Sequence, residues 1–327
     1  MAGSSVRYAV FVGWCCTLAV GVGCGLTATL LQAADEQTPT SAGLELILRN
    51  DFEKEKVVPS GKPTHDFLRM TSASGRSGNA TIQYEGGTPD DRYAQVINDP
   101  TRAGNKVLAF WLKGARIARQ GMSGHYKGRV QLILPDVNMT SVYQRVRMYL
   151  PPDVALYRSY PKDNIWFTID EFWFGASWKG ERNAFRISLN LVKQGGDGKP
   201  LWLAATAEKP AGNPKSGRWA RVWDSVNKDF EVPVGEWLDV EVGYKQGDAS
   251  SGRFYVTVTP SSTGKKVEVL NVTNWTYNPQ APRPIPLTQW QPLKLYTSSE
   301  VIDHVRNKGG VLQIYWDDLE IWKGWRQ

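Results

Sequence analysis

The sequence predicts an all-β fold, an antiparallel β-sandwich or jelly roll, and two observations support this. Short runs rich in β-branched and aromatic residues recur along the chain, and clusters of Gly, Pro, Asn and Asp separate them. No segment of a dozen residues keeps a helical period, and only 299–307 predicts a short helix. Evenly spaced strands with few helices favour packed antiparallel sheets over a parallel α/β fold.

The positions of the strands follow from these runs and from the turns between them. At 245–252, Gly and Asp are expected to adopt left-handed conformations and to join two alternating strands. After the turn at 233–236, alternation places Trp237, Asp239 and Glu241 on one face of a strand and the intervening aliphatic residues in the core. The strands are expected near 44–48, 106–112, 128–134, 142–150, 165–174, 184–193, 200–206, 237–244, 252–259, 266–270, 292–297 and 311–322.

The first 34 residues predict an export signal. Arg7 precedes an apolar stretch over 8–31, and the small residues Ala33 and Ala34 offer a cleavage zone. The alternative is an uncleaved membrane anchor, because the stretch is long enough to span a bilayer. A secreted, periplasmic or envelope-exposed protein is expected, with a flexible linker at 35–43 and a single sandwich domain at 44–327.

All three cysteines, Cys15, Cys16 and Cys24, lie in the export segment, so a mature chain has no disulfide and no thiolate metal site. The net charge of +7 suits an anionic glycan, since no nucleic-acid motif or basic run is present. The 14 tryptophans suit stacking on sugar rings, although a sandwich core also accommodates tryptophan. A monomer without a protein partner is expected.

Four segments, 230–238, 252–256, 292–296 and 314–322, resemble in their order the strands of concanavalin A-like jelly rolls. Among these they are most similar to polysaccharide lyases of the alginate, glucuronan and heparin lyase group, over most of 44–324. The resemblance implies a lyase that cleaves an acidic, uronic-acid-containing polysaccharide by β-elimination, without a cofactor for the chemistry. The alternatives are a non-catalytic glycan-binding protein and a glycoside hydrolase, because one fold serves many functions.

Two segments supply candidate residues for this chemistry. Residues 129–132, Arg-Val-Gln-Leu, resemble an Arg-x-Glu-Leu strand of alginate lyases, so Arg129 is expected to bind the uronate carboxylate beside a catalytic Gln131. Residues 293–296 resemble a second lyase strand that carries a matching lysine. This resemblance implies that Lys294 binds substrate and that Tyr296, on the same face, transfers a proton. The alternative is an ordinary solvent-facing polar row.

Other candidates come from single strands and loops. His125, in a glycine-containing approach to Arg129, is the candidate catalytic base among three histidines, although a surface histidine is the alternative for each. Residues 187–190 match the family's Gln-x-His strand poorly, because they offer Ser188 and Asn190, and Asn190 is taken as a substrate contact. The other two histidines are His65, expected in a loop, and His304, on the short helix.

The most apolar strand, at 166–174, carries two adjacent acids on opposite faces. One of Asp170 and Glu171 lies among bulky aromatic residues, where desolvation raises a carboxyl pKa and suits an acid catalyst. Glu171 and Trp173 are candidate substrate contacts. For a hydrolase, Glu171 would need a second carboxylate, for which Asp239 or Glu241 is the candidate.

A structural Ca²⁺ is the one metal expected. Glu53, near the first strand, and Asp318, in the last, resemble a pair of acids that often holds Ca²⁺ in jelly-roll carbohydrate modules. The alternative is that these acids bind neighbouring loops and lysine side chains.

Overall fold

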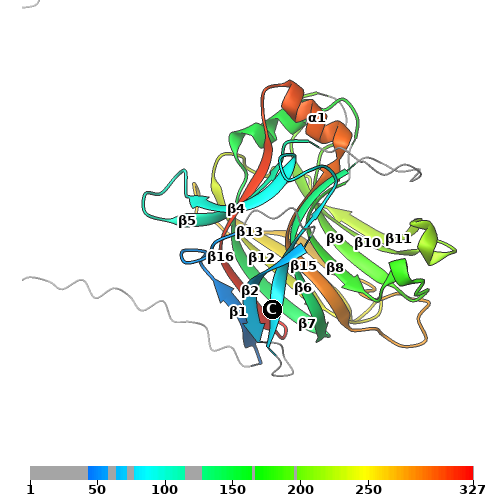
Figure 1. Cartoon of the computed structure of the whole chain (residues 1–327). Coiled ribbons are helices and arrows are strands. Elements are labelled where there is room, and N and C mark those ends of the chain that lie inside the picture. The colour runs from blue at the N-terminus through cyan, green and yellow to red at the C-terminus, as the bar shows by residue number, and fades with distance from the viewer. Residues whose placement is uncertain are drawn as a thin grey trace, which may run out of the picture. The chain divides into compact units, whose positions relative to one another are not determined.

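The computed structural model describes residues 43–57, 64–71, 77–114, 127–163, 166–194 and 197–326 (Figure 1). All of them belong to one compact unit, Ala42–Gln327. Within these ranges no helix is long and apolar enough to span a bilayer. The expected export segment at 1–34, nearly all of the linker at 35–43, and His125 lie outside the described residues.

Two antiparallel sheets of eight described strands each form a sandwich. Sheet A runs β14 (Val267–Thr273), β13 (Arg253–Pro260), β12 (Trp237–Lys245), β7 (Ser141–Tyr149), β16 (Leu312–Lys323), β5 (Lys106–Leu112) and β4 (Arg92–Asn98), with β1 (Glu45–Asn50) also paired to β16. Sheet B runs β11 (Trp219–Val226), β10 (Trp202–Pro210), β9 (Phe185–Val192), β8 (Phe167–Phe174), β15 (Leu287–Ser298), β6 (Lys127–Met139), β3 (Ser77–Glu85) and β2 (Thr64–Thr71). The predicted fold class is thereby confirmed.

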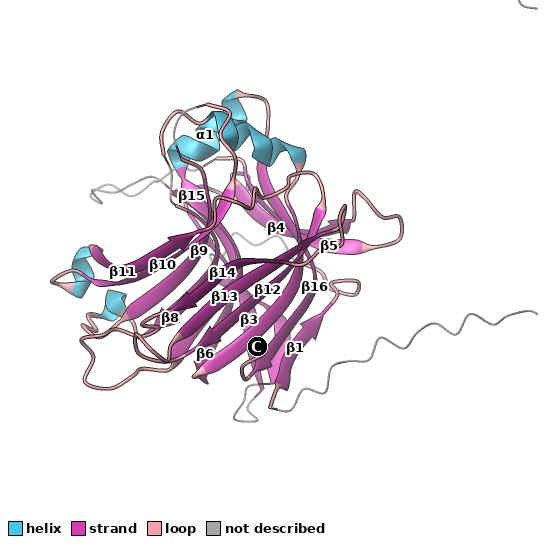
Figure 2. Cartoon of the chain, turned by 180° about the vertical axis from the view of Figure 1, so that it is seen from behind, coloured by secondary structure: helices cyan, strands magenta, loops and turns pink. Residues whose placement is uncertain are grey.

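The core lies between the two sheets because each strand directs one alternating row of apolar side chains inward. On β6, Val130, Leu132 and Leu134 are fully buried. On β12, Leu238 and Val240 join the same core cluster, as the alternation predicts. Figure 2 shows the two sheets from behind, with β9 to β11 on one side and β1 on the other. The outward-facing rows of side chains are not needed for the core and can therefore contain binding or catalytic residues.

The helix at 299–307 is confirmed as α1 (Ser299–Asn307), whose first turn is capped by the hydroxyl of Ser298, which accepts from the Val301 amide. The described residues also form three short 3₁₀ helices, η1 (Pro152–Ser159), η2 (Ser177–Lys179) and η3 (Pro214–Ser216). Every expected strand forms, whereas β2, β3, β4 and β11 are strands that the sequence reasoning missed.

The hairpin expected at 245–252 joins β12 to β13, but its expected left-handed conformations were wrong. Gly247 and Gly252 do not have positive φ. The Asp248 carboxylate instead accepts hydrogen bonds from the amides of Ser250 and Ser251, both at 2.9 Å. Glycine is required at 247 because a Cβ there would lie 2.3 Å from the Gly252 nitrogen. Close approach, not backbone handedness, decides this turn.

Candidate functional site

The outer face of sheet B carries an almost continuous polar surface, called the polar face below. Successive paired residues form a row across five strands: Glu85 on β3, Arg129 on β6, Tyr296 on β15, Thr168 on β8 and Asn190 on β9. A neighbouring row contains Gln83, Gln131 and Lys294, which are likewise successive partners. In these strands the apolar residues that alternate with the two rows point inward. The polar side chains of the rows, which come from distant parts of the chain, therefore share one surface.

Tyr296 lies among three cations. The side-chain nitrogens of Lys127 and Lys294 lie 5.6 and 4.9 Å from its ring centroid, and the guanidinium carbon of Arg129 lies 5.6 Å from it. Trp166 packs edge-on against the ring at 4.8 Å. Burial raises the pKa of the Tyr296 phenol, and Lys127 and Arg129 oppose this rise only in part. The phenol is therefore a proton donor at neutral pH.

The cations next to β3 are held by side chains of that strand. Arg129 Nη2 lies 2.8 Å from one carboxylate oxygen of Glu85, and Lys127 Nζ lies 2.7 Å from the other. The Gln83 amide oxygen accepts hydrogen bonds from Arg129 at 3.1 Å and from Gln131 at 2.7 Å. Gln131 is only 2 % exposed, and its own oxygen has no partner among the described residues. Arg129 and Lys127, with 21 % and 30 % of their side chains exposed, both meet solvent.

Lys294 and Glu171 form a buried ion pair below this surface, with side chains 1 % and 3 % exposed. The Ser188 hydroxyl donates to the Glu171 carboxylate at 3.0 Å, and Arg186 lies 3.5 Å from it. Burial lowers the pKa of Lys294 to about 8, although Glu171 opposes the shift. Burial alone raises the pKa of Glu171, but Lys294 and Arg186 outweigh it and lower the pKa to about 2. Glu171 is therefore ionised at neutral pH.

The connected ion pairs of the polar face include one more cation than carboxylates. Within the described residues its ion-paired network consists of four cations and three acids: Lys127, Arg129, Arg186, Lys294, Glu85, Glu171 and Glu208. Arg186 completes the network because its Nη2 lies 2.7 Å from Glu208 on β10. A net positive surface attracts an anionic ligand.

The two adjacent acids of β8 have opposite environments, as the alternation predicts. Asp170 points away from the polar face, is 2 % exposed, and accepts a hydrogen bond from Trp290 Nε1 at 2.8 Å. Burial raises the pKa of Asp170 to about 8. Asp170 is thus the acid with the raised pKa, but it lies in the core, where no substrate reaches it.

Replacing Asp170 by Asn is expected to stabilise the protein increasingly as pH rises. An unfolded Asp releases its proton near pH ~3.9, whereas folded Asp170 keeps it until pH about 8. The folded state binds more protons within this window, so wild-type stability falls as pH increases through it. Asn keeps the acceptor for Trp290 and has no proton to lose. We expect Asp170→Asn to match wild type near pH ~4 and to exceed it at pH ~8 by on the order of 5 kcal/mol.

Urea unfolding at several pH values measures this difference. Asp224→Asn is the matched control, because the Asp224 side chain is 57 % exposed and its replacement should leave the pH dependence unchanged. A stability difference between Asp170→Asn and wild type that does not vary with pH would contradict a protonated Asp170.

The carboxylates required for the hydrolase alternative do not meet. Glu171 lies on the outer face of sheet B, whereas Asp239 and Glu241 lie on β12 of sheet A, on the face opposite to its core residues. Asp239 faces Arg147 at 3.6 Å, and Glu241 binds Lys266 at 2.6 Å. The core separates these acids from Glu171, so the expected hydrolase pair was wrong.

Asn190 and Trp173 lie on the polar face as expected, with different accessibility. Asn190 is 3 % exposed, and its amide oxygen accepts from the Thr168 hydroxyl at 2.9 Å. Trp173 is half-buried and packs edge-on against Trp178 and Trp219, with centroids 5.2 and 5.4 Å apart. Trp173 is therefore available to a ligand, whereas the Asn190 amide is occupied within the sheet.

The histidines do not add a described proton-transfer group to the polar face. His125 lies outside the described residues, so its role as base stays a prediction. His65 belongs to β2 and not to the expected loop. His304 is on α1 as expected, where its Nε2 lies 3.0 Å from the Ser159 hydroxyl.

The two acids expected to hold Ca²⁺ have partners of their own. The Glu53 carboxylate accepts from the Lys106 amide at 2.8 Å, and the Asp318 carboxylate lies 3.8 Å from Arg147. No group of three or more His, Cys, Asp or Glu residues suited to a metal occurs within the described ranges. These contacts agree with the alternative in which the acids bind loops and cations, and Ca²⁺ stays a prediction.

Sequence reasoning missed the partners that orient Arg129 and Gln131. Gln83 and Glu85 belong to β3, which was not predicted, although residues 80–85 alternate apolar and polar side chains. Ala80, Ile82 and Tyr84 are buried, as that alternation would have indicated. A period-2 count over this segment would have found both residues.

Comparisons with known proteins report likeness of structure only. No family model matches the chain, and no curated protein matches it. An endo-β-1,4-glucuronan lyase from the fungus Trichoderma reesei matches with TM-score 0.46 and 12 % identity, over 82 % of this chain and 96 % of that one. A marine PL-14 alginate lyase from Aplysia kurodai matches with TM-score 0.44 and 9 % identity, over 73 % and 89 %.

The exoplasmic/lumenal domain of VIP36, in a Ca²⁺/Man-bound form, is also similar, with TM-score 0.37, 10 % identity and coverage of 86 % and 93 %. All three TM-scores are below 0.5, so the fold class rests on the two sheets themselves. What these proteins bind or cleave does not transfer to this chain, and its chemistry is argued from the polar face.

Proposed function

We propose that the protein is a polysaccharide lyase that cleaves a uronic-acid polymer by β-elimination on the polar face. One observation carries the proposal: the half-buried Tyr296 phenol, which holds its proton, lies among Lys127, Arg129 and Lys294. An eliminating lyase needs this combination, because a cation must neutralise the substrate carboxylate next to a group that transfers a proton.

In the proposed reaction, Arg129 binds the uronate carboxylate and makes the proton on the adjacent carbon more acidic. A base removes this proton, and the electron pair forms a carbon–carbon double bond as the glycosidic carbon–oxygen bond breaks. Tyr296 gives its proton to the departing oxygen, and burial, which raises the pKa of the phenol, keeps that proton in place at neutral pH. His125 remains the candidate base. The buried Gln131 and Lys294 help to hold Arg129 and Tyr296 in position.

Product absorbance tests the proposal directly. Purified protein is incubated with glucuronan, alginate and glycosaminoglycans, and the ultraviolet absorbance of the new conjugated double bond is followed. We expect absorbance to increase with at least one uronic-acid polymer and to stay constant with neutral dextran. No unsaturated product from any uronic-acid polymer would refute the lyase.

A non-catalytic glycan-binding protein is the second candidate, and the ion pairs of the polar face favour it. Each cation around Tyr296 already has a carboxylate partner, Glu85 for Lys127 and Arg129, and Glu171 for Lys294. A binding surface needs no base. Binding of a uronic-acid polymer without unsaturated product at any pH would select this candidate.

A further inference from the structure

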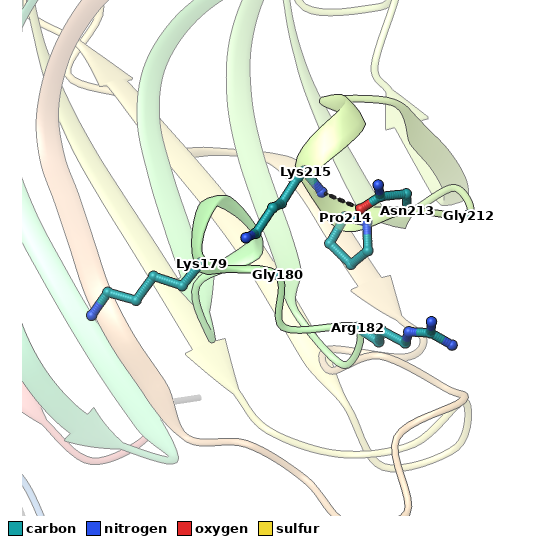
Figure 3. A pocket seen from close by; sticks show the side chains of 7 residues that line it. All are labelled: Lys179, Gly180, Arg182, Gly212, Asn213, Pro214 and Lys215. Atoms are coloured by element: carbon teal, nitrogen blue, oxygen red, sulfur yellow. Dashed lines mark hydrogen bonds between the residues drawn. The ribbon is translucent and has the colours of Figure 1, made fainter.

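A pocket of about 700 Å³ lies apart from the Tyr296 row, between two connections at one end of sheet B. The β8–β9 connection contains η2, and the β10–β11 connection contains η3. Figure 3 shows the pocket from close by, with side chains from both connections around it. We call it the η2–η3 pocket, and its lining residues are Lys179, Gly180, Arg182, Gly212, Asn213, Pro214 and Lys215.

The backbone around the pocket is held in place by local geometry. The Asn213 side chain accepts a hydrogen bond from the Lys215 amide at 3.0 Å and caps η3 (Figure 3). Gly180 has a φ of +95°, and a Cβ there would lie 3.1 Å from Lys215 Cε. The positive φ favours glycine at this position, and the cap holds η3 in place at the edge of the pocket.

The pocket is basic, and none of its described lining residues is an acid. Lys179, Arg182 and Lys215 are exposed, and none of them forms an ion pair with a described residue. Glu181, the acid in the same connection, turns its carboxylate to the Ala176 amide at 2.7 Å. Figure 3 shows the Lys179 and Arg182 side chains extending away from each other, so these cations give the surroundings of the pocket a positive charge and do not converge on one point. Such a charge attracts an anionic group.

Aromatic residues link this pocket to the polar face. Trp178, next to Lys179 on η2, is 53 % exposed and packs against Trp173 with centroids 5.2 Å apart. Trp173 packs in turn against Trp219 at 5.4 Å, and the Arg186 guanidinium lies 4.2 Å from the Trp219 ring centroid. Arg186 also contacts Glu171 in the buried pair. Sugar rings stack on such indole faces.

We infer that the η2–η3 pocket is a second subsite that binds an anionic sugar of the same polysaccharide chain. The positive charge of Lys179, Arg182 and Lys215 around the pocket attracts its carboxylate or sulfate group, and neighbouring sugar rings stack on Trp178, Trp173 and Trp219 toward the polar face. The identity of the polymer rests on the proposed function. The subsite itself needs no catalysis, since it requires only a charged glycan that spans both places.

Binding of polymers by a triple variant tests the subsite. Isothermal titration at low salt compares wild type with Lys179→Ala/Arg182→Ala/Lys215→Ala, using glucuronan, dextran sulfate and neutral dextran. The matched control removes three exposed cations from loops that follow strands of sheet A, Lys54→Ala/Arg102→Ala/Lys265→Ala. The triple variant loses three exposed ion pairs between the protein and the polymer, so we expect it to bind glucuronan about tenfold more weakly. The control variant should change glucuronan binding less than about twofold.

The outcomes separate the subsite from the lyase. Equal effects of the two triple variants on both charged polymers would overturn the subsite even if unsaturated product forms. A specific loss with the η2–η3 variant, without turnover by wild type, would retain the subsite and refute the lyase. If the loss occurs only with dextran sulfate, a sulfate binds in the pocket, and if only with glucuronan, a carboxylate does. Binding of neutral dextran that depends on the three cations would also contradict an anionic ligand.

Discussion

Replacing Tyr296 by Phe is expected to lower turnover of a uronic-acid polymer by about 10²–10⁴-fold, the usual contribution of a proton-transferring side chain. The substitution removes only the phenolic oxygen. The ring keeps its edge-on contact with Trp166 and its position among the cations. Polymer affinity is therefore expected to stay within about threefold of wild type. Initial rates of product absorbance and a parallel binding titration measure the two quantities.

Tyr93→Phe provides the control for this substitution. Tyr93 lies on β4 of sheet A, packs on Trp111 at 4.7 Å, and has no place in the polar face. Its variant should turn over substrate like wild type. Equal rates for Tyr296→Phe and wild type would remove Tyr296 from the chemistry. Equal losses in both variants would indicate damage to the fold.

Replacing Glu171 by Gln is expected to destabilise the fold by about 3–5 kcal/mol at neutral pH, because it leaves the buried Lys294 ammonium without its partner. Lys294 is 1 % exposed, so solvent cannot compensate for the loss. Urea unfolding measures the effect. The double variant Glu171→Leu/Lys294→Met should recover most of the lost stability, since an apolar pair removes both buried charges.

The effect of Glu171→Gln should disappear in acid. The folded pKa of Glu171 is lowered to about 2, whereas an unfolded Glu titrates near ~4.3. The contribution of Glu171 is fully present above pH ~4.3 and is lost as pH falls through the folded pKa. The control is Glu45→Gln, whose exposed pair with Lys323 should contribute less than about 1 kcal/mol. A similar small loss for Glu171→Gln would show that Lys294 does not depend on Glu171.

Much of the fold follows from local patterns in the sequence. Runs such as 127–139 and 237–245 alternate strongly, and both form strands with the predicted face in the core. Two of the strands that were missed, β2 and β4, have weaker patterns. Residues 64–71 and 92–98 mix charged and apolar side chains, because β2 and β4 are at the ends of their sheets. Edge strands bury less, so alternation in their sequences is less clear.

The candidate site was also only partly predictable from the sequence. Alternation alone placed Arg129 beside Gln131 and Lys294 beside Tyr296, and it separated Asp170 from Glu171. It did not show that Lys294 binds Glu171, 123 positions away in the chain. Nor did it show that Gln131 and Lys294 are buried, because their burial depends on side chains of other strands that cover them.

The sequence by itself determined which side chains share a face, because alternation within one strand is a local property. Only the tertiary structure decided which faces meet. It joined Glu85, Arg129 and Tyr296 into one row through strand pairing, and it placed Asp239 and Glu241 on the other sheet. It also brought η2 and η3 together as one basic pocket. Strand order depends on long-range contacts between sheets and loops, and no local spacing in the sequence encodes it.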